Sequence, residues 1–559
     1  MIADIILCNG KIVTVDKDFS TAEAVAIKDG LVAAVGTNYE ISSWWGTETK
    51  EFDLAGKTAI PGIIDGHPHL AVEGLRYVYP SLAGARSIDD VLKVIATEVA
   101  TRRPGDWIVT APLGDPPFYQ NVPGNLRENR FPNRHDIDRV APDNPVYIKP
   151  IWSWWNKPPV VSVANSAALR LADISRDTHP PYPGITFERD AAGEPTGLII
   201  EDAPSGILHA AQDFSVMRVA PRFTYEDRVK AFRHSLKKFN SVGTTSIYEG
   251  HGVVPEVMQV YRDYWARDEL TVRSYLVVSP PPQKSIAEYD GFMREWAMRA
   301  RGTGVGEAML KIGGVNIVWG GDFDVARLRA QEFPYAGYSD WYVDATTPEQ
   351  YRDMVMLAAR HGLRVNTIAS AQNNLDAILG IFEEVNVTYP IKGKRWVLQH
   401  LYELTPQNLA TMWRFGIVPT ILPGFHLRKT GSLRRAATPK ERWGNITPYR
   451  SILNAGLPLV TGTDGVPPEP FVALSTIIER RFQVTGEVFN PWQRLSREHA
   501  LRTMTINAAY LSFEETLKGS IEPGKYADLA VLDQDYLTVP QEQIKDITVA
   551  MTMLGGTIL

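Results

Sequence analysis

The chain has 559 residues, of which 44% are hydrophobic and 22% are charged; these fractions are typical of globular proteins and exclude disorder, collagen and coiled coil. At roughly 100–200 residues per domain, the length fits about three to five average domains or one large barrel with additions. Lys and Arg total 58 against 64 Asp and Glu, a net charge of −6, which gives no electrostatic basis for a nucleic-acid partner.

The N-terminal residues do not resemble a targeting segment. Asp4 interrupts their short apolar run and no basic stretch comes before it, unlike a signal peptide. No run approaches the ~20 apolar residues that a bilayer span needs. We therefore expect a cytoplasmic protein without a membrane partner, and a homodimer is compatible with the sequence. Cys8 is the single cysteine, so any metal must be held by histidines and carboxylates.

Both ends of the chain are rich in short strand signals. Asn9-Gly10 and Asp29-Gly30 are typical hairpin turns. The apolar runs at the two ends are Asp4–Leu7, Lys11–Val15, Ala24–Lys28, Leu31–Val35, Leu529–Leu532 and Ile547–Met551. We predict that residues 1–57 and residues 501–559, which begin with a final helix, build a single β-sandwich-like domain.

The middle of the chain alternates buried-strand candidates with helical periodicity, as at Pro348–His361 and Pro406–Phe415. The strand candidates are Ala59–Ile64, Thr244–Tyr248, Val272–Val278, Val315–Trp319, Arg364–Ile368, Trp396–Gln399, Ile417–Ile421 and Leu459–Thr463. This alternation is typical of an α/β fold, the (β/α)8 TIM-like barrel. We predict that residues 58–74 carry the first barrel strand and residues 236–500 the rest of the barrel.

The gap between the first two strand candidates, roughly 180 residues, is too long for one helix and a loop. We predict that residues 75–235 are a large insertion after the first barrel strand. Its densest aromatic group is Trp152, Trp154 and Trp155. Indole rings supply a large apolar contact area, so these three fit either the lining of a substrate pocket or the packing of the insertion.

Residue types that ligate metals follow three of the strand candidates. His67 and His69 are two residues apart, so they can face the same side of an extended chain. His400 follows Trp396–Gln399, and Asp464 follows Leu459–Thr463. Each residue alone is more often an ordinary loop or cap residue. A barrel, however, brings the carboxyl ends of its strands to the face where active sites lie, and the coincidence predicts a metal site there.

Several ordered motifs carry a resemblance to a known family. They are Asn9–Asp16, Ala24–Gly36, Asp53–Gly62, Gly193–Gly197 and Gly519–Asp533. This set resembles the amidohydrolase superfamily, specifically the amidohydrolase family 3 group that includes N-substituted formamide deformylase, and the match covers nearly the whole chain. The resemblance implies a metal-dependent hydrolase in which His67, His69 and Asp464 bind a metal, usually zinc, and in which His400 is the sixth-strand histidine.

The chain departs from the binuclear pattern of this family at two positions. Asn316 stands where a carboxylated, metal-bridging lysine is expected, and Ile368 stands where a histidine is expected. Lys311 lies before the expected strand. We therefore predict one divalent metal, a Zn²⁺, per chain, and its predicted ligands are His67, His69, Asp464 and His400.

Other residues are candidates for the same site. Glu249 and His251 follow the second strand, and either could replace a missing ligand or belong to an ordinary polar loop. Trp319, at the predicted end of the fourth strand, and His426, beyond the seventh, are candidates for substrate binding.

The predicted reaction is hydrolysis of an amide-type C–N bond in a small, apolar or aromatic substrate. A divalent ion lowers the pKa of bound water to about 7, Asp464 would take its proton and pass it to the leaving amine, and the metal or His400 would polarise the carbonyl. Two alternatives stay open. One is another reaction on the same scaffold, such as that of a deaminase, lactonase or decarboxylase; the other is a non-catalytic relative with a degenerate metal site.

Overall fold

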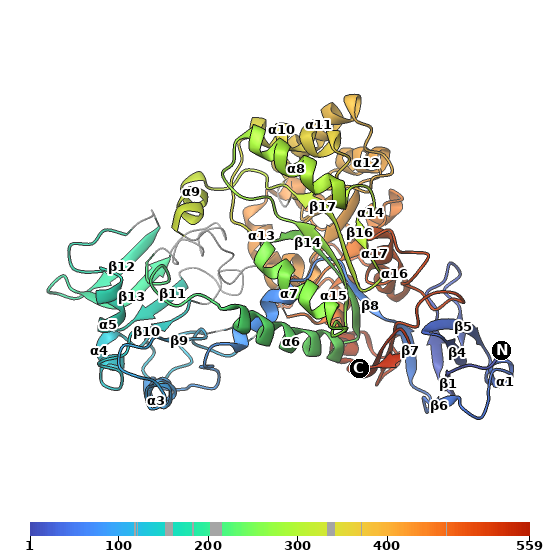
Figure 1. Cartoon of the computed structure of the whole chain (residues 1–559), viewed down its shortest axis with the longest axis horizontal. Coiled ribbons are helices and arrows are strands. Elements are labelled where there is room, and N and C mark those ends of the chain that lie inside the picture. Colours follow the sequence, from blue (N-terminus) through green and yellow to red (C-terminus); the bar gives the residue numbers. More distant parts are fainter. Residues whose placement is uncertain are drawn as a thin grey trace. The chain divides into compact units, whose positions relative to one another are not determined.

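The computed structural model describes residues 1–116, 119, 121–150, 160–180, 184–201, 215–332, 341–369, 372–464 and 467–559. The chain divides into two compact units, whose elements are drawn in Figure 1. Unit 1 comprises Met1–Leu70, Arg233–Gly320 and Thr346–Leu559, and unit 2 comprises Ala71–Phe232 and Gly321–Ala345. All the metal-ligand candidates at the strand ends therefore belong to unit 1.

Unit 1 contains a barrel of parallel strands. In spatial order they are β8 (Ile63–Asp65), β14 (Thr244–Val253), β15 (Arg273–Val278), β17 (Leu310–Asn316), β18 (Val365–Ile368), β19 (Val397–Gln399), β20 (Val418–Ile421) and β21 (Val460–Thr461). The first and last strands meet through the backbone, because the Gly66 N–H donates to the Thr461 carbonyl at 3.1 Å and the Asp464 N–H donates to the His67 carbonyl at 2.8 Å. The prediction of a (β/α)8 TIM-like barrel is confirmed.

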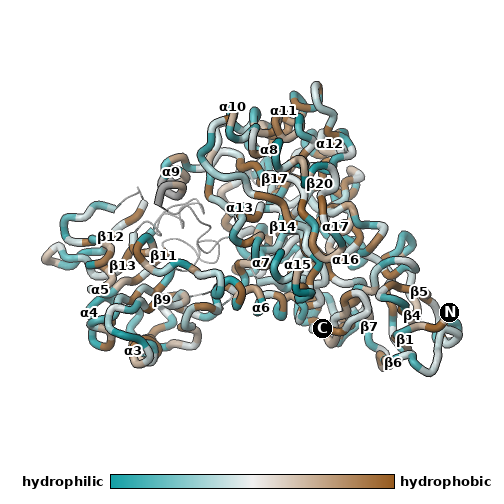
Figure 2. Tube along the Cα trace, viewed as in Figure 1, coloured by the Kyte–Doolittle hydropathy of each residue, from teal (hydrophilic) through white to brown (hydrophobic). Residues whose placement is uncertain are grey.

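Helices between the strands pack an apolar face against the barrel. On α10 (Pro348–Arg360), Tyr351, Met354, Val355 and Ala358 are buried, which is the spacing of one helix face. The Thr347 side chain caps this helix and a proline begins it. Figure 2 colours the chain trace by hydropathy, and hydrophobic and hydrophilic segments alternate along it. Other helices are α1 (Asn38–Ser42), α6 (Tyr225–Ser241), α7 (Pro255–Ala266), α8 (Ile286–Ala300), α11 (Gln372–Thr388), α12 (Pro406–Phe415), α13 (Gly431–Ala437), α14 (Tyr449–Asn454), α15 (Pro470–Glu479), α16 (Arg497–Thr503) and α17 (Ile506–Leu511).

The first expected barrel strand, Ala59–Ile64, divides at Gly62. Its first part, β7 (Thr58–Pro61), pairs in a sheet of the terminal domain, and its second part is barrel strand β8. A Cβ at Gly62 would lie 2.2 Å from Thr245 Oγ1. The chain therefore passes β14 at a distance that only glycine allows, and the strand breaks there.

The fourth barrel strand begins at Leu310 rather than at Val315. Lys311 therefore lies within the strand, and the expectation that it precedes the strand is wrong. Pairing with β15 begins at Leu310. A Cβ at Gly313 would lie 2.3 Å from the Tyr275 hydroxyl, so glycine leaves room for this side chain.

Strands from both ends of the chain share one sheet. Its order is β24 (Thr557–Ile558), β23 (Val549–Leu554), β22 (Leu529–Leu532), β7, β2 (Lys11–Val13) and β3 (Thr21–Ala22), and a second sheet has the order β5 (Leu31–Gly36), β4 (Ala24–Lys28), β1 (Ile5–Cys8) and β6 (Lys50–Asp53). Side chains from both sheets, among them Leu7, Ile12, Val25, Leu529 and Val531, form one buried cluster. The prediction of a β-sandwich-like domain built from both termini is confirmed.

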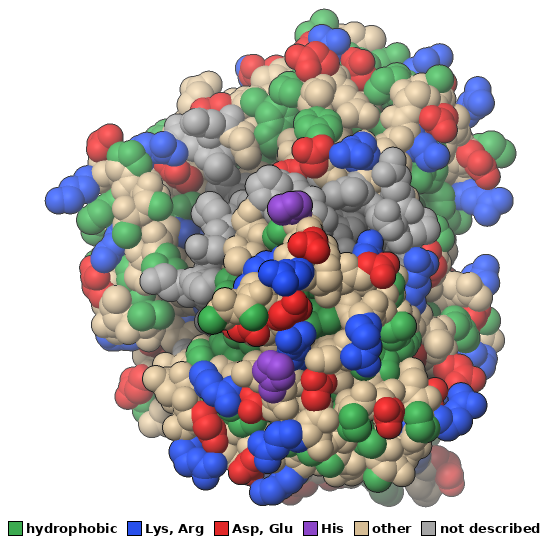
Figure 3. Space-filling view, turned by 90° about the vertical axis from the view of Figure 1, so that its left-hand side faces the viewer, with side chains coloured by type: hydrophobic (Ala, Val, Ile, Leu, Met, Phe, Trp, Pro, Cys, Tyr) green, Lys and Arg blue, Asp and Glu red, His purple; other side chains and the backbone are tan. Residues whose placement is uncertain are grey.

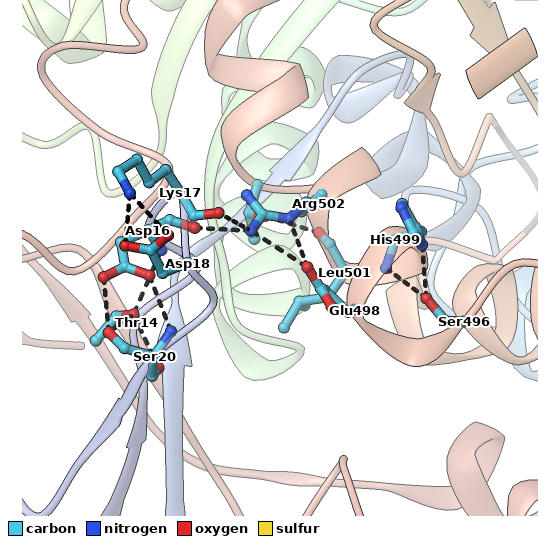
Figure 4. Close-up of polar contacts among 11 residues, drawn as sticks. Thr14, Asp16, Lys17, Asp18, Ser20, Ser496, Glu498, His499, Leu501 and Arg502 are labelled. Atoms are coloured by element: carbon cyan, nitrogen blue, oxygen red, sulfur yellow. Dashed lines mark hydrogen bonds and ion pairs between the residues drawn. The ribbon is translucent and has the colours of Figure 1, made fainter. Parts of the chain in front are cut away.

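Charged side chains join this domain to the barrel within unit 1. Arg502 of α16 donates to the carbonyl oxygens of Asp16 at 2.7 Å and Lys17 at 3.2 Å, in the loop after β2 (Figure 4). Arg273, at the start of β15, forms a two-bond ion pair with Asp528 at 2.8 and 3.1 Å. The side chains of this second pair are only 6% and 4% exposed, so water cannot replace either partner.

Unit 2 is built on a separate sheet in the order β12 (Ile185–Arg189), β13 (Pro195–Glu201), β11 (Val160–Ala164), β10 (Val146–Ile148) and β9 (Ile108–Thr110). The helices α2 (Leu70–Glu73), α3 (Ile88–Val99), α4 (Arg134–Asp138), α5 (Ser166–Leu171) and α9 (Phe323–Glu332) accompany it. Two hydrophobic clusters cover its faces; Tyr147 and Ile199 belong to one, Ile148 and Val163 to the other. The prediction of a large insertion after the first barrel strand is confirmed.

One segment of unit 2 was expected in the barrel. Gly321–Ala345 groups with the insertion, and Val343 packs against the cluster that contains Tyr147. Sequence periodicity cannot reveal such a grouping, because it depends on long-range contacts. The residues Trp152, Trp154 and Trp155 lie outside the described part of the chain.

No helix among the described residues is long and apolar enough to cross a membrane. Acidic and basic side chains are interspersed on the face that Figure 3 shows, in keeping with the balance of 58 basic and 64 acidic residues.

We predict that Asp528→Asn lowers the free energy of unfolding by roughly 3–5 kcal/mol, because it leaves the Arg273 guanidinium buried without its counter-charge. Urea unfolding measures the change. Asp18→Asn is the matched control, since the ion pair of Asp18 with Lys17 is exposed and such pairs contribute little. Equal effects of the two substitutions would contradict a special role for the buried pair.

Candidate metal centre

Side chains that can ligate a metal converge at the carboxyl ends of the barrel strands. They are His67 and His69 after β8, His251 in β14, His400 after β19 and Asp464 after β21. The His67 ring centroid lies 5.6 Å from that of His251 and 4.7 Å from that of His400. Ring nitrogens of His67, His69 and His251 all lie within 4.8 Å of one another, as a group that could hold a metal ion.

A buried carboxylate positions the first of these loops. Asp65 ends β8, and its Oδ1 accepts from the His67 N–H at 3.1 Å and from the Thr463 N–H at 3.0 Å. The Thr463 hydroxyl donates to the other oxygen. Burial raises the pKa of Asp65 to about 6, although these hydrogen bonds act to lower it. Asp65 thus joins the two loops that carry His67 and Asp464.

His400 and Asp464 both leave the strand conformation. Their φ angles are 58° and 61°, in the left-handed region that residues other than glycine rarely adopt. Backbone strain of this kind persists where the surroundings enforce it, and it clusters at functional sites. Here the strained residues are two of the converging side chains.

The closest approaches fit ligands of a single ion. His400 Nε2 lies 3.0 Å from His67 Nε2, and His69 Nε2 lies 3.3 Å from Asp464 Oδ1. His400 Nε2 and Asp464 Oδ2 are 4.0 Å apart. Two ligands at about 2.0–2.1 Å from a tetrahedral zinc are separated by about 3.3 Å. Imidazole nitrogen and carboxylate oxygen are also donors that divalent ions accept, so the residues present fit one metal.

Burial keeps the converging imidazoles neutral. It lowers the pKa of His67 to about 3 and holds the pKa values of His251 and His400 well below their usual range, and neighbouring histidines add to the effect. A neutral imidazole is the form that ligates a metal. The rings can therefore bind an ion without first losing a proton.

The structure separates the two candidates on β14. His251 joins the histidine group. The Oε1 atom of Glu249 instead accepts from the Leu70 N–H at 2.8 Å and from the Tyr261 hydroxyl at 2.9 Å. This oxygen of Glu249 therefore holds the chain just after His69, while the His251 ring lies among the other imidazoles.

The positions at which a bridging lysine and a further histidine were expected carry other side chains. Asn316 ends β17 and is buried, and Ile368 ends β18. Lys311 lies near the start of β17, and its Nζ approaches the Glu514 carboxylate at 3.9 Å. The Lys311 amine thus lies at the amino end of β17, whereas the converging histidines lie at the carboxyl ends of the barrel strands.

A π-helix, η4 (Gly424–Lys429), follows β20 and places two further residues near the centre. His426 is buried, with its ring centroid 5.5 Å from that of His400. Burial lowers the pKa of Lys429 to about 6, against the attraction of the Asp464 carboxylate. Sequence reasoning missed Lys429; the available signal was a basic pair, Arg428-Lys429, soon after a barrel strand.

Trp319 does not end its strand as predicted, because β17 stops at Asn316. Its ring packs edge-to-face against Tyr351 of α10, with centroids 5.0 Å apart. Contact of Trp319 with a substrate stays a prediction.

Comparison with known proteins agrees with this barrel fold. A family profile described as Amidohydrolase family matches residues 50–559. Protein LONG AFTER FAR-RED 3 of Arabidopsis thaliana is 25% identical over 569 residues, covering 100% of this chain and 91% of that protein. N-substituted formamide deformylase of Arthrobacter pascens is 25% identical over 572 residues, covering 99% and 98%. Among solved structures, an uncharacterized metal-dependent hydrolase from Pyrococcus horikoshii OT3 has a TM-score of 0.67 at 20% identity, covering 96% of this chain and 99% of that one. Since the family profile spans most of its length, the chain belongs to the amidohydrolase family.

Proposed function

We propose that the protein is a metal-dependent hydrolase that cleaves an amide-type C–N bond of a small molecule. The observation that carries the proposal is the convergence of His67, His69, His400 and Asp464 at ligand-to-ligand distances on the carboxyl face of the barrel. Membership of the amidohydrolase family supports hydrolysis. Similarity to an N-substituted formamide deformylase over the whole chain supports an amide as the bond that is cleaved.

These four residues and His251 are the donors from which one divalent ion, a zinc, would take its ligands, with one position left for water. When bound, such an ion supplies a water that is acidic enough to lose its proton at neutral pH, and it polarises a carbonyl oxygen. The neutral imidazoles and the single carboxylate leave a net positive charge on the occupied centre, which favours an oxyanion.

Asp464 serves as the proton carrier in this proposal. Its side chain is 13% exposed, more than the 2% of His69, and one of its oxygens lies 3.3 Å from His69 Nε2. The carboxylate accepts a proton from the attacking water and delivers it to the nitrogen of the breaking C–N bond. The products are an acid and an amine.

His426 is the proposed substrate contact on η4. The rings of Tyr402 and Phe425 lie 5.9 and 5.0 Å from its own ring, so its surroundings are aromatic. Such surroundings favour an apolar or aromatic group on the substrate.

We expect Asp464→Asn to abolish turnover while the fold is kept, because an amide is a poor ligand and cannot carry the proton. Hydrolysis of a panel of N-substituted formamides and anilides, followed by amine release, measures the loss, and circular dichroism checks the fold. Near-normal turnover by this variant would contradict the role of Asp464.

Purified protein is expected to carry about one equivalent of divalent metal per chain. Elemental analysis measures the content, and removal by a chelator should stop amide hydrolysis until zinc is returned. Two equivalents per chain would contradict a single-ion centre. A chain that binds no metal and releases no amine would contradict the proposed function itself.

His251→Ala and Glu249→Gln should separate the two candidates on β14. Loss of the imidazole removes a donor, so zinc affinity should fall by about 10-fold or more. Glutamine keeps an oxygen for the Leu70 N–H and the Tyr261 hydroxyl, so Glu249→Gln should bind zinc nearly as well as the unchanged chain. Competition with a chromogenic chelator gives both affinities, and the reverse order would make Glu249 the ligand.

A further inference from the structure

We propose that Gln399 is a positioning residue of the metal centre: its buried amide links His67, on the β8 side, to the β14 backbone beside His251. The inference rests on the proposed metal-dependent function and concerns a residue outside the ligand set. It is carried by the hydrogen bond at the nitrogen end of this side chain and by two buried atoms without a hydrogen bond among the described residues, its oxygen and the Nδ1 atom of His67.

The nitrogen end of the amide faces β14. Gln399 ends β19 and is fully buried, and its Nε2 donates to the Gly250 carbonyl at 2.6 Å. Because a carbonyl oxygen can only accept, this bond determines which end of the amide is which. Gly250 lies between Glu249 and His251, and a Cβ there would lie 2.6 Å from Gln399 Nε2. Glycine at this position therefore makes room for the amide.

The oxygen end of the Gln399 amide is available to accept a hydrogen bond from the His67 imidazole. Gln399 Oε1 and His67 Nδ1 are both buried, and neither makes a hydrogen bond of standard geometry to any described residue. His67 Nε2 faces His400 Nε2 at 3.0 Å. If Nε2 is the ligating atom, Nδ1 carries the proton and needs an acceptor, the usual arrangement for a metal-bound histidine.

The position of Gln399 agrees with this pairing. Its side chain lies within interaction distance of the His67 ring, although the geometry falls short of a standard hydrogen bond. Gln399 is thus close enough to His67 to act as that acceptor.

The backbone explains how two consecutive residues serve one centre. Successive side chains of a strand point to opposite faces, so a regular strand with Gln399 inside would turn His400 away. The φ of 58° at His400 ends that alternation, and the His400 ring reaches His67 Nε2. In this arrangement Gln399 faces Nδ1 of the His67 imidazole and His400 faces Nε2 of the same ring.

A neutral amide is suited to this place because it donates at one end and accepts at the other. A carboxylate would accept from His67 but would repel the Gly250 carbonyl. A thioether of similar size would do neither. Metal binding should therefore respond to each replacement differently.

The experiment compares zinc affinity, measured by chelator competition, and the visible spectrum of the cobalt(II)-loaded protein in three variants. We expect Gln399→Met to weaken zinc binding about 10- to 100-fold and to shift the cobalt spectrum. The zinc affinity of Gln399→Glu should lie between that of Gln399→Met and that of the unchanged chain. The control is Tyr248→Phe, which removes another buried hydrogen bond of the barrel, to Asn366 Oδ1 at 2.7 Å, and should leave both readouts unchanged. Melting of the metal-free proteins compares the structural cost of the substitutions.

Zinc binding by Gln399→Met as tight as that of the unchanged chain would overturn the inference while leaving the proposed function standing. Equal weakening by Tyr248→Phe would also overturn it, because a loosened barrel would then account for the loss. If Gln399→Met does not fold, Gln399→Glu decides, and unchanged affinity and spectrum in that variant would refute the role. Failure of the unchanged chain to bind zinc would be the distinct failure of the proposed function.

Discussion

The junction between the first and last barrel strands is the constraint on which the centre depends. The Asp464 N–H donates to the His67 carbonyl, and the Asp65 carboxylate accepts from the N–H groups of both His67 and Thr463. Asp65 and Thr463 are 398 residues apart in sequence, yet these buried bonds place their loops side by side. Because buried polar groups cannot exchange their partners for water without a large cost, the junction determines the spacing of the candidate ligands that follow both strands.

Burial then sets the chemical state of the site. In water, the four imidazoles and the one carboxylate of this site would carry a mixture of charges. Here burial holds the imidazoles of His67, His251 and His400 neutral. The same desolvation acts on Lys429. A centre of neutral donors with one carboxylate is matched to a divalent cation, because the cation's charge is then the largest local charge and orders the groups around it.

Glycines allow the backbone of this barrel to approach neighbouring side chains and strands closely at several points. Gly62 lets the chain pass Thr245, Gly250 admits the Gln399 amide, and a Cβ at Gly462 would lie 2.5 Å from the Cβ of His67. Each glycine stands where a backbone segment meets a functional side chain or the strand beside it. Strand propensity does not predict these glycines, because glycine in a strand is normally destabilising. The neighbouring residues in the folded chain explain why glycine is needed at each position.

Sequence by itself determined the periodic and local features: the alternation of strands and helices, the terminal β runs, and the residues His67, His69, His400 and Asp464 at strand ends. These follow from hydrophobic period and from the rule that barrel strands end at one face. Tertiary structure alone decided the break at Gly62, the grouping of Gly321–Ala345 with the insertion, the turn of His251 rather than Glu249 toward the histidine group, and the approach of Lys429 to Asp464. All four depend on contacts between residues far apart in the chain, and the direction of a side chain near a strand end changes with a single φ angle, as at His400.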